Sequence, residues 1–171
     1  MIDNMAARIL VGLGSNRGAS VDIVRSAMRE LETMSRSGFR ASSLWWTSPV
    51  DCPSGSSNFV NAAAVLVIDL VTPEEVLRVL KTIEGRNGRD RMPIKNAPRE
   101  LDLDLLLYSE GETDTLCESD ALTLPHPRAM ERRFVMVPAA EVAPDWVWPG
   151  TQRTIADLAR YLVTDEQICR V

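Results

Sequence analysis

Residues 101–107 read Leu-Asp-Leu-Asp-Leu-Leu-Leu, and this alternation of apolar and acidic side chains predicts a β-strand over residues 100–108. Because successive side chains of a strand point to opposite faces, Asp102 and Asp104 share one face, roughly 7 Å apart by the rise of the strand. The apolar residues that point the other way, into the core, are Leu101, Leu103 and Leu105. The strand is therefore expected to present two neighbouring carboxylates on the face opposite its leucines.

These paired carboxylates have two interpretations. Two carboxylates side by side repel each other, and without a countercharge they lose part of their ionisation. A hard divalent cation resolves the conflict, and Mg²⁺ typically binds one or two carboxylates together with phosphate oxygens. An exposed acidic face on an edge strand would contain the same two residues. The pair alone therefore predicts either a metal site or a solvated surface.

Residues 86–99, directly before this strand, contain five basic side chains and one acidic side chain, Asp90. The basic residues are Arg86, Arg89, Arg91, Lys95 and Arg99. Guanidinium groups form bidentate, charge-assisted hydrogen bonds with phosphate oxygens. A solvated basic loop is the alternative, but next to two carboxylates the cluster favours a site for a polyphosphate and a metal ion. The sequence contains no GxxxxGK[ST] loop, and Gly12-x-Gly14 lacks the third glycine of a dinucleotide fingerprint.

The rest of the chain predicts alternating helices and strands. An apolar run closed by glycines predicts a first strand over 9–13, and helical spacing predicts a helix over about 19–35. Further strands are expected over 39–46 and 59–68, with a turn-rich loop over 51–57 between them.

A second helix has an explicit start signal, with Thr72 as N-cap, Pro73 in the first turn and Glu75 completing a capping box. This helix is expected to end near Gly88. The proline-rich tail is expected to hold short helices and turns. Strands joined by short loops with helices between them predict an α+β sandwich around a mostly antiparallel sheet, in one domain over 1–171.

Composition excludes several classes of protein. Of the 171 residues, 45% are hydrophobic and 25% charged, and the net charge of -5 gives no global basic footprint for nucleic acid. No apolar run approaches the length of a membrane-spanning helix, so we expect no membrane partner and a cytoplasmic location. Three widely separated cysteines are expected to be free thiols. His126 is the only histidine, which makes oxygen ligands the default for any metal.

Several short motifs follow one another in an order found in one enzyme family. They are Gly14-Ser15-Asn16, Phe59-Val60-Asn61-Ala62-Ala63, Ile83-Glu84, Gly88-Arg89-x-Arg91, Pro98-Arg99-x-Leu101-Asp102-Leu103-Asp104, Pro125-His126-Pro127 and Arg132-x-Phe134. In these motifs the chain resembles 6-hydroxymethyl-7,8-dihydropterin pyrophosphokinase (HPPK) over roughly residues 8–150. The run from Pro98 to Asp104 is the most specific of them.

The resemblance implies a fold, a reaction and a set of roles. The fold would be a three-layer α/β/α ferredoxin-like sandwich, and the monomeric enzyme would transfer diphosphate from ATP to the hydroxymethyl group of the pterin, releasing AMP. Two Mg²⁺ ions would lie between the ATP phosphates and Asp102 and Asp104. The residues implied to bind the pterin are Thr47, Pro49, Val50, Phe59, Asn61 and Phe134. Arg89 and Arg99 would contact the transferred phosphates, and the residues implied to surround ATP are Glu84, Arg91, Arg99, Thr123, His126 and Arg132.

Some features depart from the family pattern or fit more than one role. Asn96-Ala97 stand where the family usually has a tryptophan and a glycine. Phe59 and Phe134 could simply be core residues, whereas a buried amide at Asn61 needs partners. A non-catalytic pterin- or nucleotide-binding paralogue and a metal-dependent phosphohydrolase remain as alternatives. The first would bind without releasing AMP, and the second would consume ATP regardless of pterin.

Overall fold

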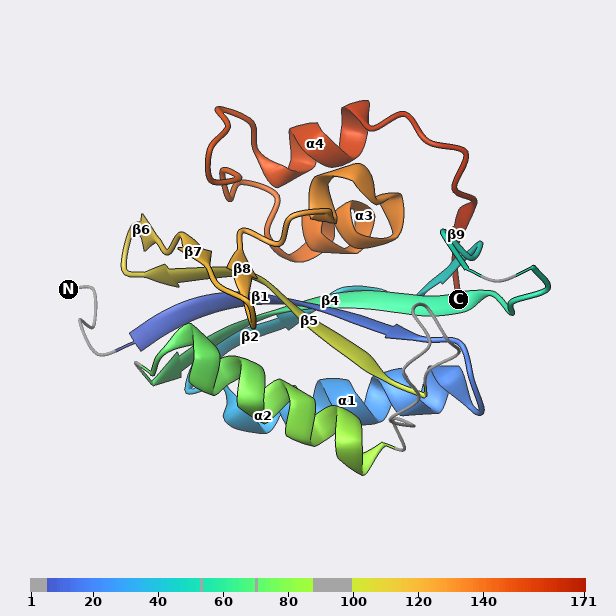
Figure 1. The fold of residues 1–171 in the computed structure, drawn as a ribbon, viewed down its shortest axis with the longest axis horizontal. Coiled ribbons are helices and arrows are strands. Elements are labelled where there is room, and N and C mark those ends of the chain that lie inside the picture. The colour runs from blue at the N-terminus through green and yellow to red at the C-terminus, as the bar shows by residue number, and fades with distance from the viewer. Residues whose placement is uncertain (1–5, 53, 70, 88–99) are drawn as a thin grey trace.

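The structure, a computed structural model, describes residues 6–52, 54–69, 71–87 and 100–171. Within these ranges the chain is an α+β protein, in which an antiparallel sheet packs against helices (Figure 1). The sheet has seven strands in the order β6-β5-β1-β4-β3-β9, and β2 also pairs with β4. These strands are β1 (Ala6–Ser15), β2 (Ser37–Ala41), β3 (Trp45–Thr47), β4 (Phe59–Asp69), β5 (Asp102–Glu110), β6 (Thr113–Asp114) and β9 (Ile168–Arg170).

The remaining elements pack on or beside this sheet. A separate two-stranded sheet joins β7 (Cys117–Glu118) to β8 (Thr123–Leu124). The helices are α1 (Ser20–Met34), α2 (Pro73–Arg86), the short 3-10 helix η1 (Ala129–Glu131), α3 (Arg133–Val142) and α4 (Ile155–Tyr161). No helix in the described ranges is long and apolar enough to cross a membrane.

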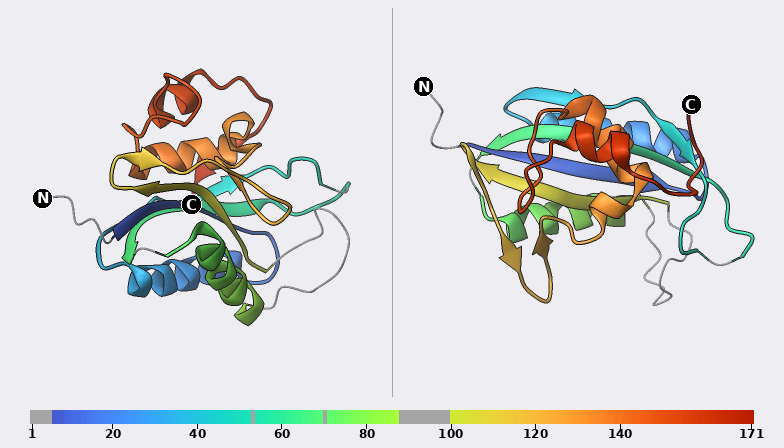
Figure 2. Two further views of the ribbon diagram at one scale, coloured as in Figure 1. Left: turned by 60° about the vertical axis from the view of Figure 1, so that its left-hand side comes forward. Right: turned by 90° about the horizontal axis from the view of Figure 1, so that it is seen from above.

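The two faces of the sheet carry two separate cores. Helices α1 and α2 cover one face, and α3 and α4 lie over the other (Figure 2). Alternation along β1 supplies both cores: Ile9, Val11 and Leu13 pack with α1 and α2, while Leu10 packs with α3 and α4. The predicted alternation is confirmed over residues 101–105, because Leu101, Leu103 and Leu105 lie in the core shared with α1 and α2. A register shift opposite Leu10 and Val11 then interrupts it, and both Leu106 and Leu107 lie in the other core.

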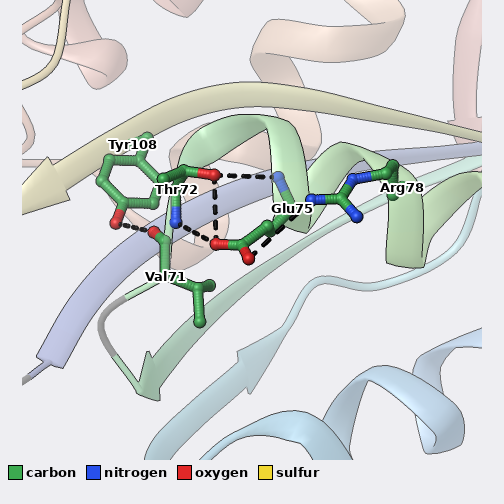
Figure 3. A network of polar contacts seen from close by, with 5 residues as sticks. All are labelled: Val71, Thr72, Glu75, Arg78 and Tyr108. Atoms are coloured by element: carbon green, nitrogen blue, oxygen red, sulfur yellow. Dashed lines mark hydrogen bonds and ion pairs between the residues drawn. The ribbon is translucent and has the colours of Figure 1, made fainter.

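Helix α2 begins at the signal that the sequence predicted. Thr72 and Glu75 form both hydrogen bonds of a capping box: the Glu75 carboxylate accepts from the Thr72 N–H at 2.8 Å, and Thr72 Oγ1 accepts from the Glu75 N–H at 3.3 Å (Figure 3). The Tyr108 hydroxyl donates to the Val71 carbonyl, which ties the chain before the helix to β5. The predicted first helix and the strand over 59–68 are also confirmed, as α1 and β4.

The single strand predicted over 39–46 is wrong, because the structure contains two strands with a bulge between them. Ala41 pairs with Ala64 and Trp45 with Asn61, so three residues of this segment lie opposite two of β4. Ser42 occupies the break: its N–H donates to the Ala63 carbonyl, and its Oγ accepts from the Ala63 N–H, each at 2.9 Å. A side chain therefore replaces one backbone partner, and periodicity alone cannot reveal that substitution.

Candidate active site

The register of three strands builds the floor of a cavity on the face that α3 and α4 cover. Gly14 of β1 pairs with Asp102 of β5 on one side and with Asn61 of β4 on the other. Two residues earlier on β1, Gly12 pairs with Asp104. Directly paired residues share a face, so a carboxylate, a glycine and an amide form one row across the sheet. Because both glycines lack side chains, the floor between the acids and Asn61 stays open.

The walls of this cavity come from segments far apart in the sequence. One wall is formed by β3, β4 and the loop between them, and the other by the turn after β8 together with the start of α3. The residues of the first wall are Thr47, Ser48, Val50, Cys52 and Phe59. The residues of the second wall are His126, Arg128, Arg132, Phe134 and Val135. The cavity therefore has an aromatic ring on each side and a polar floor.

Asn61 is a buried amide in a fixed orientation. Its side chain is 4% exposed, and its Nδ2 donates to Thr47 Oγ1 at 2.6 Å. A Cβ added to Gly14 would lie 2.8 Å from Asn61 Oδ1, so this amide depends on the glycine beside it. A buried amide kept in place by a partner and by lack of space can recognise the polar edge of a ligand.

The environment of the floor disfavours ionisation of one of its two carboxylates, Asp104. Burial, followed by the charge of Asp102, raises the pKa of Asp104 to about 6, against an opposing effect of Lys81. Among the described residues no group of three or more His, Cys, Asp or Glu side chains could hold a metal. Two half-buried carboxylates lining an open cavity nevertheless fit Mg²⁺, which completes its shell with phosphate and water oxygens.

The backbone between the two acids is held from the opposite face of the sheet. Glu84 of α2 is fully buried, and its Oε1 accepts from the Leu103 N–H at 2.8 Å. The same oxygen lies 2.8 Å from Lys81 Nζ. The Lys81 amine also donates to the Leu103 carbonyl at 3.4 Å. A lysine–glutamate pair on α2 thus contacts the peptide groups that connect Asp102 to Asp104.

Cationic and neutral groups face the acids across the cavity. Burial and the neighbouring Arg128 lower the pKa of Arg132, whereas Asp104 raises it. Burial, followed by the charges of Arg132 and Arg128, lowers the pKa of His126 to about 4. The imidazole is therefore neutral near pH 7, and its Nδ1 accepts from the Arg128 N–H at 3.3 Å. This arrangement offers fixed positive charge and a neutral hydrogen-bonding ring to an anionic ligand.

Comparison with known proteins identifies the family. The sequence profile of the family described as 7,8-dihydro-6-hydroxymethylpterin-pyrophosphokinase (HPPK) matches residues 10–144. The chain belongs to the HPPK family. The resemblance drawn from the sequence motifs is thereby confirmed.

Relatives and solved structures agree with this assignment. The 2-amino-4-hydroxy-6-hydroxymethyldihydropteridine pyrophosphokinase of Synechocystis sp. is 39% identical over 149 residues, covering 87% of this chain and 73% of the relative. The protein of the same name from Haemophilus influenzae is 31% identical over 158 residues, covering 92% and 94%. A wild-type Plasmodium falciparum HPPK-DHPS structure has a TM-score of 0.68 with 14% identity, covering 91% of this chain and 44% of that one, which shows the fold alone.

Most of the residues that the HPPK resemblance implied lie together in the cavity. They are Thr47, Val50, Phe59, Asn61, Asp102, Asp104, His126, Arg132 and Phe134. Pro49, Glu84 and Thr123 do not line it, and Glu84 instead contacts the backbone of β5 from the other face. Arg89, Arg91, Arg99 and the Asn96-Ala97 pair lie outside the described residues. The ligand contacts of all these residues remain predictions.

The cavity also contains residues that the sequence motifs did not single out. Arg128 and Cys52 line it, together with the floor residue Gly12. Arg128 directly follows Pro125-His126-Pro127, so its place beside a family motif was an available signal. Cys52 gave none, because only the folding of the β3–β4 loop brings it to the cavity.

Proposed function

We propose that this HPPK carries out its reaction in the cavity on the α3 face of the sheet. The hydroxymethyl oxygen of 6-hydroxymethyl-7,8-dihydropterin attacks the β-phosphorus of ATP, and AMP leaves, a step in folate biosynthesis. One observation carries this proposal: in the row of Asp102, Gly14 and Asn61, a half-buried acid and a fixed amide share one open floor. The reaction needs one end of the site to bind metal and phosphate and the other to bind the ring. Asp102 on β5 and Asn61 on β4 provide these two ends, with β1 between them.

The ring of the pterin binds at the Asn61 end. Phe59 and Phe134 stand on opposite walls, and a flat heteroaromatic ring stacks between such side chains. The amide of Asn61 pairs with the polar edge of the ring, while Thr47 fixes that amide through its 2.6 Å hydrogen bond. Val50 contributes apolar lining at the same wall, and Pro49 is proposed to adjoin it.

The phosphates of ATP bind at the acid end. Asp102 and Asp104 would hold Mg²⁺, two ions as the family resemblance implies, and the metal would neutralise phosphate charge there. Arg132 and His126 face the same space, and Arg128 adds a cation there. Further ATP contacts are assigned to Thr123, and to Arg89, Arg91 and Arg99, which lie outside the described residues. The fully buried Glu84 is assigned a supporting role instead, through its hydrogen bond to the backbone between Asp102 and Asp104.

Positioning and charge neutralisation supply the chemistry. Phosphoryl transfer passes through a loose transition state whose charge is spread over phosphate oxygens, so fixed cations matter more than a covalent nucleophile. Holding the two reactants in one orientation removes much of the entropic barrier. We also propose that the chain acts as a monomer, in one domain over 1–171. Its helices on both sheet faces support the finer description as a ferredoxin-like sandwich.

Pterin-dependent release of AMP tests the function. Purified protein is incubated with Mg-ATP, with and without the hydroxymethyl dihydropterin, and AMP is quantified. We expect AMP only when both substrates are present, and none after chelation of the metal. Loss of ATP at the same rate without pterin would favour a phosphohydrolase. Binding of pterin and ATP with no AMP would favour a non-catalytic paralogue.

A further inference from the structure

The C-terminal segment Glu166–Arg170 connects the two walls of the cavity, although it lies beyond residues 10–144 that match the family profile. The chain leaves α4 and descends from the helical layer to the edge of the sheet, where it ends as β9 (Figure 1). We call residues 166–170 the C-terminal strap. Its contacts with α3 and with β3 are the basis of the inference.

Glu166 holds the first turn of α3. The N-cap residue of this helix, Arg132, makes no side-chain cap hydrogen bond. In its place the Glu166 carboxylate accepts from the Phe134 N–H at 2.9 Å, across 32 residues of sequence. A carboxylate at a helix N-terminus satisfies an N–H group that lacks a partner within the helix. Phe134 itself belongs to the cavity wall.

Gln167, the next residue, holds the opposite wall. Its carbonyl accepts from the Ser48 N–H at 3.0 Å, and its own N–H donates to Ser48 Oγ at 3.1 Å. Ser48 lines the cavity and follows Thr47, the partner of Asn61. One residue of the strap therefore fixes the Phe134 wall and its neighbour fixes the Thr47 wall.

The far end of the strap is anchored as well. Arg170 pairs with Glu141 of α3 at 3.3 Å, and Glu141 also accepts from the Ser43 N–H at 2.8 Å. Between the ends, β9 pairs with β3 at Thr47, Trp46 and Trp45. The strap thus contacts α3 at both ends and the sheet edge along its length, so neither wall can shift alone without breaking a hydrogen bond.

We infer that Glu166 is a positioning residue for the pterin ring, because it fixes the distance of Phe134 from the Thr47 wall. Glu166 and Gln167 are adjacent, and consecutive Cα atoms lie about 3.8 Å apart, so the connection between the walls has almost no slack. We call the space between the Phe134 wall and the Thr47 wall the slot. If the slot already has the width of a flat ring, ligand binding does not bear the cost of ordering the two walls. This inference rests on the proposed function, since it assumes that the slot receives the pterin.

Steady-state kinetics of three Glu166 variants test the inference. Glu166→Ala removes the acceptor, and Glu166→Asp withdraws it by one methylene with little risk to folding. Glu166→Gln keeps an oxygen that can accept from Phe134. Because Glu166→Ala removes a charge-assisted hydrogen bond, we expect the KM for pterin to rise about tenfold, with the KM for ATP changed less than twofold. Glu166→Asp changes the same constant in the same direction, and Glu166→Gln restores most of the affinity.

Asp165→Ala is the matched control, because Asp165 is the exposed acidic neighbour of Glu166. Its KM for pterin is expected to match that of the unaltered chain. An unchanged pterin KM in both Glu166→Ala and Glu166→Asp, or equal loss in Glu166→Ala and Glu166→Gln, would overturn the positioning role. Absence of pterin-dependent AMP release in the unaltered chain would instead refute the proposed function, so the two failures are distinguishable.

Discussion

The two faces of the same strands have opposite properties. On the α1–α2 face the long strands β1, β4 and β5 contribute apolar side chains to a closed core, which also contains Leu103 and Leu105 of β5 and residues of α2. On the α3–α4 face the apolar cover stops near Ala63 and Leu106, and beyond it the same strands present Gly14, Asn61 and Asp102 to a cavity. One sheet therefore serves stability on one side and chemistry on the other, and strand alternation separates the two roles residue by residue.

Adjacent residues of β5 provide the sharpest test of this separation. Asp104→Asn should reduce kcat by about 10³-fold, because a ligand for the metal–phosphate end is lost. Its stability should not fall, since the variant removes an acid whose ionisation is disfavoured by the charge of Asp102. Leu103→Ala, one residue away on the closed face, should lower the free energy of unfolding by about 2–5 kcal/mol.

AMP release and urea unfolding of both variants give the comparison. Activity per folded molecule should remain measurable in Leu103→Ala, although some loss is expected because Glu84 contacts its backbone. Near-normal activity of Asp104→Asn with Mg²⁺ would contradict the metal assignment.

The α3–α4 face, which contains the cavity and which we call the open face, carries two groups with shifted pKa values. In metal-free protein these groups should make the free energy of unfolding depend on pH. The pKa of Asp104 is raised from 3.8 to about 6, so the folded chain retains a proton that the unfolded chain releases. Asp104 therefore makes the free energy of unfolding fall as the pH rises from about 4 to 6. The pKa of His126 is lowered from 6.5 to about 4, so its effect has the opposite sign and its stabilisation is lost as the pH falls through that window.

Two variants separate these opposing effects. We compare the free energy of unfolding of each variant with that of the unaltered chain as the pH rises. For Asp104→Asn this difference should increase by up to about 3 kcal/mol from pH 4 to 6. For His126→Gln it should decrease by a similar amount from pH 4 to 6.5, because the unaltered chain regains the stability that it had lost at low pH. Urea unfolding in a chelating buffer across this range measures both. Parallel stability curves for the three proteins would show that neither group titrates as its burial implies.

The sequence predicted the closed face better than the open one. The capping box at Thr72 and the alternation of residues 101–105 depend on local spacing, and the structure confirms both. The strand break at Ser42 and the pairing of β9 with β3 depend on contacts between distant segments, which periodicity does not encode. In the same way, Asp102 and Asn61 were identified one at a time, but only the register on β1 places them in one row.

The smallest predicted effect concerns Gly14, which separates these two residues on the floor. A Cβ at Gly14 would lie 2.8 Å from Asn61 Oδ1, and Asn61 cannot easily rotate because Thr47 holds its other amide atom. Gly14→Ala should therefore cost about 1–3 kcal/mol of stability. It should also raise the KM for pterin severalfold by displacing the amide. Gly12→Ala is the matched comparison: its Cβ would meet flexible Leu106 at 3.4 Å, so its effect on both quantities should be smaller.

A double-mutant cycle isolates the contact between Gly14 and Asn61. In an Asn61→Ala background the clash is absent, so adding Gly14→Ala should cost little further stability, whereas independent sites would show the full cost again. Urea unfolding of the four proteins measures the coupling, and pterin titrations of the two single variants report on recognition. Additive stability changes would mean that the alanine meets something other than Asn61. Unchanged pterin affinity in Gly14→Ala would mean that the orientation of this amide does not control binding on the open face.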